Sequence, residues 1–328
     1  MADHLYLQDD GLTLKNRLGI QHDPGRLSRA EASRTAYRQA QLVRDGLPDA
    51  QGVDLLKAVH HHLFQDVYDW AGKFRTTPLE KEDFVGGART VFTPPHLIER
   101  DAKALFDRFA QEGAFQGLSP AAITDRLADR FAALNALHPF REGNGRTQRI
   151  ILSDMARKDG VDLSFEGLSK ERMASVSIAA ARGDLDPARR MFDELLDPAR
   201  HRDLVHATRG LENYRRAAEQ RSEKGVFDWR DRYIATTTPG QAYAGQFAGR
   251  RGDTFLLGTH GRIFVGRIAD LPNKGAGIQS GDTVSFTATA TSSTERHSYW
   301  DKVRAAGAGR TASKSDVSET IRKGPRPK

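Results

Sequence analysis

The chain of 328 residues contains no cysteine. Disulfide bonds, thiolate metal sites and a cysteine nucleophile are therefore excluded, and the composition agrees with a reducing cytosol. Long apolar runs are also missing, because no stretch approaches the roughly 18 residues that a membrane-spanning helix requires. The first residues lack the basic and apolar segments of a secretory signal peptide. No membrane partner is expected.

Basic charge is unevenly spread along the chain. The net charge is +7, and residues 301–328 hold eight Lys or Arg against three Asp or Glu, which is +5 and leaves +2 for the remainder. A nucleic-acid-binding protein should carry its basic face on the folded body. Nucleic acid is therefore not an expected partner, and the basic tail, rich in Ala, Gly and Ser, is predicted to be disordered.

The length predicts two domains, at about 150 residues per domain. Helical periodicity and helix start and stop signals dominate the first 200 residues. Ser119 and Pro120 form one such start, as an N-cap followed by the first helical residue. The helices expected are at 28–46, 55–70, 96–115, 120–138 and 145–158, with two more between 169 and 196.

Two regions depart from this helical pattern. Residues 76–92 contain Thr, Val and Phe around a Gly86-Gly87 pair and are followed by Pro94-Pro95, which predicts a short β-hairpin. After Asp197, a charged stretch leads into short apolar runs separated by glycine-containing turns. This second pattern predicts a linker helix and a small antiparallel β domain that could close into a barrel.

The stretch "HPFREGNGRTQR" at 138–149 joins the end of one expected helix to the start of the next. Its Gly-Asn-Gly turn permits positive φ and leaves free N–H groups at a helix start, where anions bind. Arg146 and Arg149 are three residues apart and share a helix face. Such a turn is common on its own, but two guanidinium groups beside it predict a polyphosphate ligand.

Two further side chains of this stretch complete the chemistry. Glu142 would repel a phosphate by itself, but it fits a Mg²⁺ ion that bridges a carboxylate to phosphate oxygens. His138, at the end of the preceding helix, can act as general base for an incoming hydroxyl group. The residues therefore predict a nucleotide site with an acid–base residue beside it.

At this point the stretch resembles a known family. It fits without mismatch the pattern His-x-Phe-x-(Asp/Glu)-Gly-Asn-Gly-Arg-x-x-Arg of the Fic domain proteins, which transfer AMP from ATP to hydroxyl groups of target proteins. The stretches "HHHLFQDVYDWAGKFR" and "RTVFTPP" resemble the core helix and the flap hairpin of that family. More loosely, "GDTFLLGTHGRIFVGRIADLP" resembles the OB-like domain of Bartonella type IV secreted effectors and related conjugative toxins.

The resemblance implies a mainly α fold in three parts. Residues 1–200 would form a Fic adenylyltransferase domain, residues 201–300 a linker helix and an OB-like β-barrel, and residues 301–328 the basic tail. His138 would deprotonate a target Tyr, Thr or Ser, Phe140 would anchor the loop, and Glu142 would hold Mg²⁺. The phosphates of ATP would be bound by Gly143, Asn144, Gly145, Arg146, Thr147, Gln148 and Arg149.

The flap is implied to hold the target segment by strand addition. Phe84, Gly86 and Gly87 are its candidate docking residues. The sequence reads Gly87-Ala88 where many relatives carry Lys-Gly, which makes the target harder to infer. A type II topoisomerase subunit is the target suggested by the related conjugative toxins.

Fic proteins are often restrained by a helix carrying (Ser/Thr)-x-x-x-Glu-(Gly/Asn), whose Glu pairs with the last arginine of the motif. Residues 208–213, "TRGLEN", fit this pattern, although Gly210 weakens a helix. The effectors that the chain resembles are instead restrained by a separate small antitoxin, which is the partner we favour. Comparison of the wild type with Glu212→Gly distinguishes the two.

The resemblance also bears on location and on length. It implies a toxin or effector of the bacterial cytoplasm, with translocation into a recipient cell by type IV secretion machinery as a further possibility. Such effectors usually end in a further helical secretion domain, whereas only a basic tail follows Trp300. The expectation is either a fragment of a longer effector or a tail that is itself the signal.

Two other functions stay open from the sequence. A related Fic phosphotransferase could move a different phosphate-containing group, because the turn recognises phosphates and not a base. An inactive Fic binding or secretion module is the second alternative, and the intact His138 and the two arginines disfavour it. The run His60-His61-His62 is not expected to bind metal, because successive helix positions point about 100° apart; one of the three is expected to pack in the core.

Overall fold

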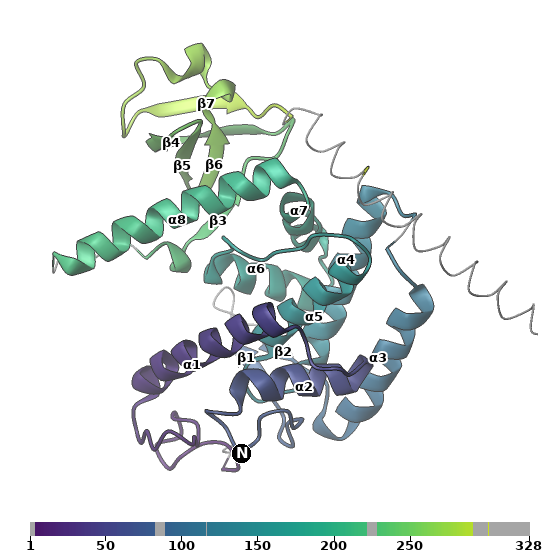
Figure 1. Cartoon of the computed structure of the whole chain (residues 1–328). Coiled ribbons are helices and arrows are strands. Elements are labelled where there is room, and N and C mark those ends of the chain that lie inside the picture. The colour runs from purple at the N-terminus through teal and green to yellow at the C-terminus, as the bar shows by residue number, and fades with distance from the viewer. Residues whose placement is uncertain (1–3, 83–88, 116, 222–227, 291–300, 302–328) are drawn as a thin grey trace, which may run out of the picture. The chain divides into compact units, whose positions relative to one another are not determined.

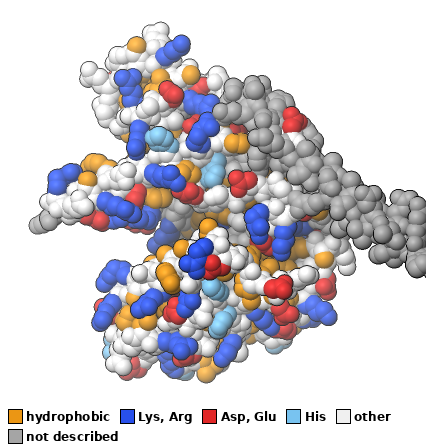
Figure 2. Space-filling view, in the orientation of Figure 1, with side chains coloured by type: hydrophobic (Ala, Val, Ile, Leu, Met, Phe, Trp, Pro, Cys, Tyr) orange, Lys and Arg blue, Asp and Glu red, His pale blue; other side chains and the backbone are white. Residues whose placement is uncertain are grey.

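The computed structural model describes residues 4–82, 89–115, 117–221, 228–290 and 301. The chain divides into two compact units, Met1–Ala114 with Asp129–Met155 and Phe115–Ala128 with Ala156–Lys328. No helix in the described part of the chain is both long enough and apolar enough to cross a membrane. Figure 2 shows lysine and arginine side chains interspersed with acidic ones. The basic tail lies almost entirely outside the described residues.

The first unit is built from helices that confirm most of the expected ones (Figure 1). It contains α1 (Pro24–Asp45), α2 (Gly52–Phe64), α3 (Ile98–Glu112) and parts of α4 (Pro120–Leu137) and α5 (Asn144–Lys158). Helix α1 starts four residues before the expected Ser28. Asp23 caps it by accepting a hydrogen bond from the Arg26 N–H, and Pro24 supplies a preset φ at the first turn.

The apolar faces of these helices form the core around which the site is built. Helix α2 lies beside α1 (Figure 1) and buries Val59, Leu63 and Phe64 completely. Phe131 of α4 and Ile151 of α5 are also fully buried. The segment between α4 and α5 is held against α2 by His60, whose ring stacks on Phe140 and whose Nε2 contacts the Glu142 carbonyl.

The expected hairpin is confirmed. Strand β1 (Glu80–Glu82) pairs antiparallel with β2 (Arg89–Val91), with Glu80 opposite Val91 and Lys81 opposite Thr90. The tip, with the candidate docking residues Phe84, Gly86 and Gly87, lies outside the described residues. The strands themselves are short, and the Val91 side chain is 70% exposed.

The second unit combines helices with a sheet. The side-chain oxygen of Ser119 accepts a hydrogen bond from the Ala122 N–H at 3.2 Å, which confirms the expected start of α4. Helices α6 (Lys170–Ala181) and α7 (Asp186–Leu195) are the two expected between 169 and 196, and α8 (Pro198–Gln220) follows them. The long α8 helix lies at the predicted position of the linker helix (Figure 1).

The sheet has five strands in the order β3-β6-β5-β4-β7. They are β3 (Tyr233–Thr236), β4 (Ala242–Arg251), β5 (Thr254–Thr259), β6 (Arg262–Arg267) and β7 (Thr283–Thr287). The expectation of an antiparallel domain is wrong for β3, which pairs parallel with β6. Within the described residues the edge strands β3 and β7 do not pair with each other, so the sheet is open and not a closed barrel.

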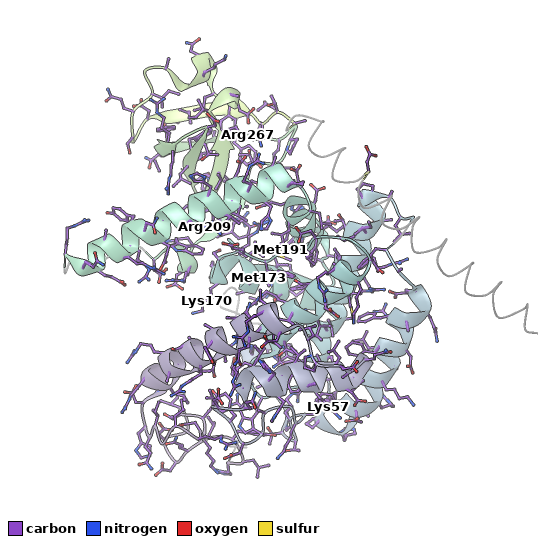
Figure 3. The ribbon with its side chains drawn as sticks, in the orientation of Figure 1. Lys57, Lys170, Met173, Met191, Arg209 and Arg267 are labelled. Atoms are coloured by element: carbon purple, nitrogen blue, oxygen red, sulfur yellow. The ribbon has the colours of Figure 1, made fainter. Side chains whose placement is uncertain are left out.

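The sheet is stabilised by an apolar cluster of its own and by a contact with α8. Tyr243, Phe247, Phe255 and Phe286 pack into one apolar cluster, and Phe264 packs against it. Strand β6 is joined to α8 by Arg267, labelled in Figure 3, whose Nε donates to Asp203 at 3.0 Å. The sheet therefore has its own core and is tied to the helices of its own unit.

A buried ion pair joins the helices of this unit to β3. Both nitrogens of the Arg172 fork donate to the Glu194 carboxylate, at 2.9 and 2.8 Å, and both side chains are almost fully buried. Arg172 also donates to the Ile234 carbonyl at 3.2 Å, and Glu194 accepts from the Thr236 N–H at 3.3 Å. Strand β3 is thus held by charged groups of α6 and α7 as well as by β6.

Candidate active site

The segment from the end of α4 to the start of α5 forms a closed loop. The Asn144 side chain accepts a hydrogen bond from the Phe140 N–H at 2.9 Å and donates one to the Phe140 carbonyl at 2.7 Å. At the other end of the loop, His138 has a φ of +41°. This left-handed conformation is uncommon for a residue with a side chain, so surrounding contacts must hold it.

Phe140 fixes the loop to α2 through an aromatic stack. Its ring is completely buried and lies parallel to the His60 ring, with 3.7 Å between centroids. His60 Nδ1 accepts from the Gly72 N–H at 2.8 Å, so Nε2 carries the proton and donates to the Glu142 carbonyl at 3.0 Å. His60 is therefore the buried member of the three-histidine run. It contacts the loop at both Phe140 and Glu142.

Gly143 is required by packing. Its φ is +82°, and a Cβ atom there would lie 2.2 Å from Cζ of Phe64. The glycine therefore lets the loop backbone approach the Phe64 ring, not only a ligand. The same ring carries the guanidinium group of Arg146 on its face, 4.7 Å from the centroid.

His138 is a buried and neutral imidazole. Its side chain lies under the Phe92 ring at 3.8 Å between centroids, and the residue is 7% exposed. Nδ1 lies 3.3 Å from the Asn135 carbonyl, which can only accept, so Nδ1 carries the proton and Nε2 has the free lone pair. Burial, with smaller contributions from the charges of Lys81 and Arg75, lowers the pKa of His138 to about 3.

The pKa values of two buried histidines make the first unit sensitive to acid. Burial also lowers the pKa of His60 to about 3. The unfolded chain binds a proton at each site near pH 6.5, whereas the folded chain does not until about pH 3. The unfolded state therefore holds more protons below pH 6.5, and stability that is complete above this pH is lost as the pH falls.

We expect the free energy of unfolding to drop by about 2 kcal/mol for each of these two histidines between pH 7 and pH 5. Urea unfolding followed by circular dichroism at both pH values measures the drop. His138→Gln removes one titrating group, so the variant should lose only about half as much over the same interval. An undiminished drop in the variant would show that His138 is already charged in the folded protein.

The start of α5 offers an anion site. Among the described residues, none accepts a hydrogen bond from the backbone N–H groups of Gly145 and Arg146, so these donors are free. Arg149 is one turn further along and has no carboxylate partner in the described part of the chain. Burial and then the charge of Arg146 lower the pKa of Arg149 to about 10, so it stays cationic at neutral pH.

Arg146 is engaged differently from Arg149. Its Nη2 donates to Glu31 of α1 at 2.5 Å and lies 3.4 Å from Glu142, while Nη1 donates to Thr35 at 3.1 Å. The Tyr68 hydroxyl group donates to the other oxygen of Glu31. Arg146 is thus oriented by a carboxylate of α1, a residue that the sequence did not single out.

Glu142 projects from the loop as a single carboxylate. Its side chain is 42% exposed, and one oxygen accepts from the Gly143 N–H at 2.9 Å. In the described residues no group of three or more His, Cys, Asp or Glu is arranged around a common metal position. One exposed carboxylate beside the arginine side chains and the free N–H groups of the helix start is compatible with Mg²⁺, which takes most of its other ligands from phosphate and water.

Thr147 and Gln148 point into the protein. Thr147 is buried and its hydroxyl group donates to the Gly143 carbonyl at 3.1 Å, while Gln148 donates to the Phe131 carbonyl at 2.6 Å. Both side chains therefore support the loop and α5. Gly145, in contrast, lies beside the Arg149 guanidinium group. A Cβ atom at Gly145 would be 3.4 Å from Nη1 of Arg149.

Four residues contribute to the site without a signal in the motif: Glu31, His60, Arg75 and Phe92. Each lies between 46 and 115 positions from its partner in the chain. Residue spacing in the sequence therefore could not show which residues are in contact. Arg75 ends the stretch "DWAGKFR", where its position directly before a hairpin was the available signal.

Within the described residues, a neutral histidine lies beside a helix start with free N–H groups and an arginine that has no carboxylate partner, an arrangement that suits a phosphate-bearing ligand. A profile of the Fic/DOC family matches residues 51–156, which contain this whole loop. The chain is 34% identical over 195 residues to the Salmonella typhimurium protein named "Probable protein adenylyltransferase Fic", and the match covers 60% of the chain and 93% of that relative. The chain belongs to the Fic/DOC family.

Other relatives extend beyond the Fic region. The chain is 29% identical over 299 residues, 88% of its length, to a protein adenylyltransferase of Bartonella henselae, and it spans 53% of that relative. The solved structure of the type IV secretion system effector protein BepA has a TM-score of 0.73 with 28% identity and covers 88% of this chain and 97% of its own. AMP transfer to protein is therefore the nucleotidyltransferase activity that the family relationship supports.

One solved neighbour was determined with a nucleotide. The N-terminal Fic domain of a Bartonella quintana effector, with bound ADP, has a TM-score of 0.54 and 29% identity, and it covers 60% of this chain and 95% of its own. The match supports an adenine nucleotide as the substrate class of the shared fold.

Proposed function

We propose that the chain transfers AMP from ATP to a Tyr, Thr or Ser hydroxyl group of a target protein, with His138 as general base. The observation that carries this proposal is the free Nε2 lone pair of a buried, neutral His138 at the end of a loop whose other end opens α5. A base of this kind does not need to lose a proton before it can accept one from the target.

The reaction needs few groups. His138 takes the proton of the target hydroxyl group as its oxygen forms a bond to the α-phosphorus of ATP. The bond from that phosphorus to the bridging oxygen breaks, and pyrophosphate leaves with the electron pair. The free N–H groups of Gly145 and Arg146 and the cation of Arg149 neutralise phosphate charge without reorganising, which is the main way in which such sites accelerate phosphate chemistry.

Glu142 is the residue that would hold Mg²⁺. When bound, the ion would offset the negative charge of the phosphates beside the loop. The Glu142 carboxylate is kept in place by the Gly143 N–H, and its charge also contributes to orienting Arg146. Arg146 would reach the phosphates only from its position beside Glu31, whereas Arg149 has no such competing carboxylate in the described residues.

The hairpin β1–β2 would hold the target. Two strands leave open edges, and an added target strand would satisfy backbone groups along one of them. Phe84, Gly86 and Gly87 would contribute at the tip. A type II topoisomerase subunit is the target class suggested by the resemblance to conjugative toxins.

The relatives also suggest a setting for this activity. One solved relative is a type IV secretion system effector protein, which favours a toxin or effector made in a bacterial cytoplasm and passed to a recipient cell. A small antitoxin is the proposed inhibitor. The five-stranded sheet of the second unit is proposed to be OB-like, on the basis of its strand number and its "GDTF" and "GDTV" turns.

The proposal is tested by incubating the protein and Mg²⁺ with a bacterial lysate and ATP labelled at the α- or the γ-phosphate. Protein labelling from the α-phosphate alone is the expected result, because AMP retains only that phosphorus. Labelling from the γ-phosphate would instead indicate a kinase-like phosphotransferase. Absence of both labels would overturn the enzymatic proposal in favour of a binding module.

Glu212, in the "TRGLEN" segment, is occupied by groups of its own unit. It accepts hydrogen bonds from Arg215 and Arg216, each at 2.9 Å, and from the Trp229 indole at 3.1 Å, and it forms an ion pair with Arg230 at 2.9 Å. The hydrogen bond that Arg215 donates to Glu212, followed by those from Trp229 and Arg216, holds the pKa of the Glu212 carboxyl group well below its usual range. These contacts engage the carboxylate within its own unit, which supports the proposal of a separate inhibitor.

We therefore expect Glu212→Gly to leave α-phosphate labelling within about threefold of the wild type while lowering the thermal midpoint. The glycine costs about 1 kcal/mol in a helix interior and removes the acceptor of four donors. Glu212→Gln, which keeps the helix propensity, should label at the wild-type rate. A large gain of labelling in both variants would identify Glu212 as a built-in inhibitor and remove the need for an antitoxin.

A further inference from the structure

Arg75 is a buried arginine at the junction of the hairpin and the loop. It is 2% exposed, and its fork donates to three backbone carbonyl groups. Nε donates to His138 at 2.9 Å, Nη1 to Thr77 at 2.9 Å and Nη2 to Thr93 at 2.5 Å. The Arg75 N–H also donates to the Pro139 carbonyl at 2.8 Å.

The three carbonyl groups belong to different parts of the site. Thr77 lies just before β1 and Thr93 just after β2, so Arg75 ties together both ends of the hairpin. The third carbonyl is that of His138, the residue with a φ of +41°. One side chain therefore fixes the base and the two roots of the hairpin to a common point.

Other contacts follow the same path. Phe92, directly after β2, stacks on His138, and the Thr93 N–H donates to the Ala136 carbonyl at 3.1 Å. The exit of the hairpin is thereby pressed against the last turn of α4. These two contacts join the hairpin exit to the end of α4 directly, and Arg75 joins the same two segments through the carbonyl groups of Thr93 and His138. A shift of the Arg75 guanidinium group would therefore change how the hairpin and His138 are held relative to each other.

The charge of Arg75 is unusual for a structural residue. No carboxylate in the described residues forms an ion pair with it, and burial lowers its pKa. Buried cations normally have an acidic partner, because desolvation is costly. Only a planar fork with several donors can satisfy three carbonyl groups at fixed angles, which a lysine ammonium group cannot reproduce.

We propose that Arg75 is a positioning residue that sets the place of the hairpin relative to His138, so that a hydroxyl group on a docked target segment meets Nε2. This proposal rests on the proposed AMP transfer. It assigns Arg75 to acceptance of the protein substrate and not to nucleotide binding, because its side chain donates to the two roots of the hairpin and to His138 and to no group at the start of α5 in the described residues.

The test compares Arg75→Lys with a matched control, Arg130→Lys. Arg130 is also a buried arginine of the first unit, but its side chain donates to groups at the end of α3: the carbonyl groups of Phe109 and Gly113, each at 3.2 Å, and the Glu112 carboxylate at 3.3 Å. Both variants should lose some stability. Only Arg75→Lys should lower kcat/KM for labelling of the target protein, by at least about thirtyfold, since small misplacements of reacting groups have large effects on rate.

Two further measurements separate positioning from general damage. The Kd for ADP, measured by calorimetry, should stay within about twofold of the wild type in both variants, because Arg75 does not touch the start of α5. Amide hydrogen exchange should become faster at Thr93 and in β1 and β2 of Arg75→Lys, but not in those of Arg130→Lys.

Equal labelling by the two lysine variants would overturn the proposal, as would a loss of ADP binding in Arg75→Lys that matches its loss of labelling. If the wild type labels no protein, the proposed function fails by itself. Hydrogen exchange still decides in that case, because unchanged protection of the hairpin in Arg75→Lys would show that Arg75 does not hold it.

Discussion

Replacement of His138 by alanine should lower the rate of AMP transfer by about 10²–10⁴-fold, the usual contribution of a positioned general base. The imidazole is neutral because burial lowers its pKa to about 3, and Nδ1 is directed at the Asn135 carbonyl. No other described imidazole shares its position under Phe92 at the end of α4. The measurement is the initial rate of protein labelling from ATP labelled at the α-phosphate.

Alanine at this position also removes a ring that packs on Phe92, so folding needs a control. His138→Gln keeps part of that packing and cannot act as a base, and it should be as inactive as the alanine variant. His96→Ala removes an exposed histidine of the same unit and should label at the wild-type rate. Binding of ADP should be retained in all three variants. If His138→Ala labelled protein at more than about one tenth of the wild-type rate, His138 would be excluded as the base.

Glu194→Ala should be the most destabilising change in the second unit, lowering the free energy of unfolding by about 3–5 kcal/mol. Arg172 would keep its charge in a fully buried position and lose both hydrogen bonds to the carboxylate, and the Thr236 N–H would lose its acceptor. Urea unfolding followed by circular dichroism measures this change.

Two comparisons identify the cause of that loss. Glu171→Ala removes an exposed acidic residue beside Arg172 on α6 and should change stability by no more than about 0.5 kcal/mol. The double variant Arg172→Met/Glu194→Leu replaces the pair by apolar side chains and should recover much of the stability lost in Glu194→Ala. A cost below about 1 kcal/mol for Glu194→Ala would mean that water reaches Arg172.

The local parts of the site were predictable because the sequence places them together. The helix end, the Gly-Asn-Gly turn and the helix start lie within 138–149, and each has a short-range signal. Ser119 and Pro120 predicted the start of α4 for the same reason, and the Gly86-Gly87 pair and the Pro94-Pro95 stop indicated a hairpin. Roles that need a bound nucleotide or a target remain predictions from the motif.

The supporting residues could not be predicted, because their partners are distant in the chain. Glu31 contacts Arg146 across 115 positions, and Arg75 contacts His138 across 63. Neither residue type suggests its partner, since exposed arginines and glutamates are common on helices. The parallel pairing of β3 was missed for a related reason: β3 and β6 are separated by two other strands, and a parallel partner has no turn signal.

The loop is closed by Asn144, which precedes a glycine, and an Asn-Gly pair is the sequence most exposed to slow chemical ageing. Spontaneous deamidation requires the Gly145 nitrogen to attack the side-chain carbonyl carbon of Asn144. Both ends of that carboxamide are held by Phe140, at 2.9 and 2.7 Å, and the pair lies in the first turn of α5. An aspartate formed there would turn an oxygen towards the Phe140 carbonyl oxygen and open the loop. The working lifetime of the protein therefore depends on how well the two hydrogen bonds to Phe140 keep the Asn144 side chain away from the Gly145 nitrogen.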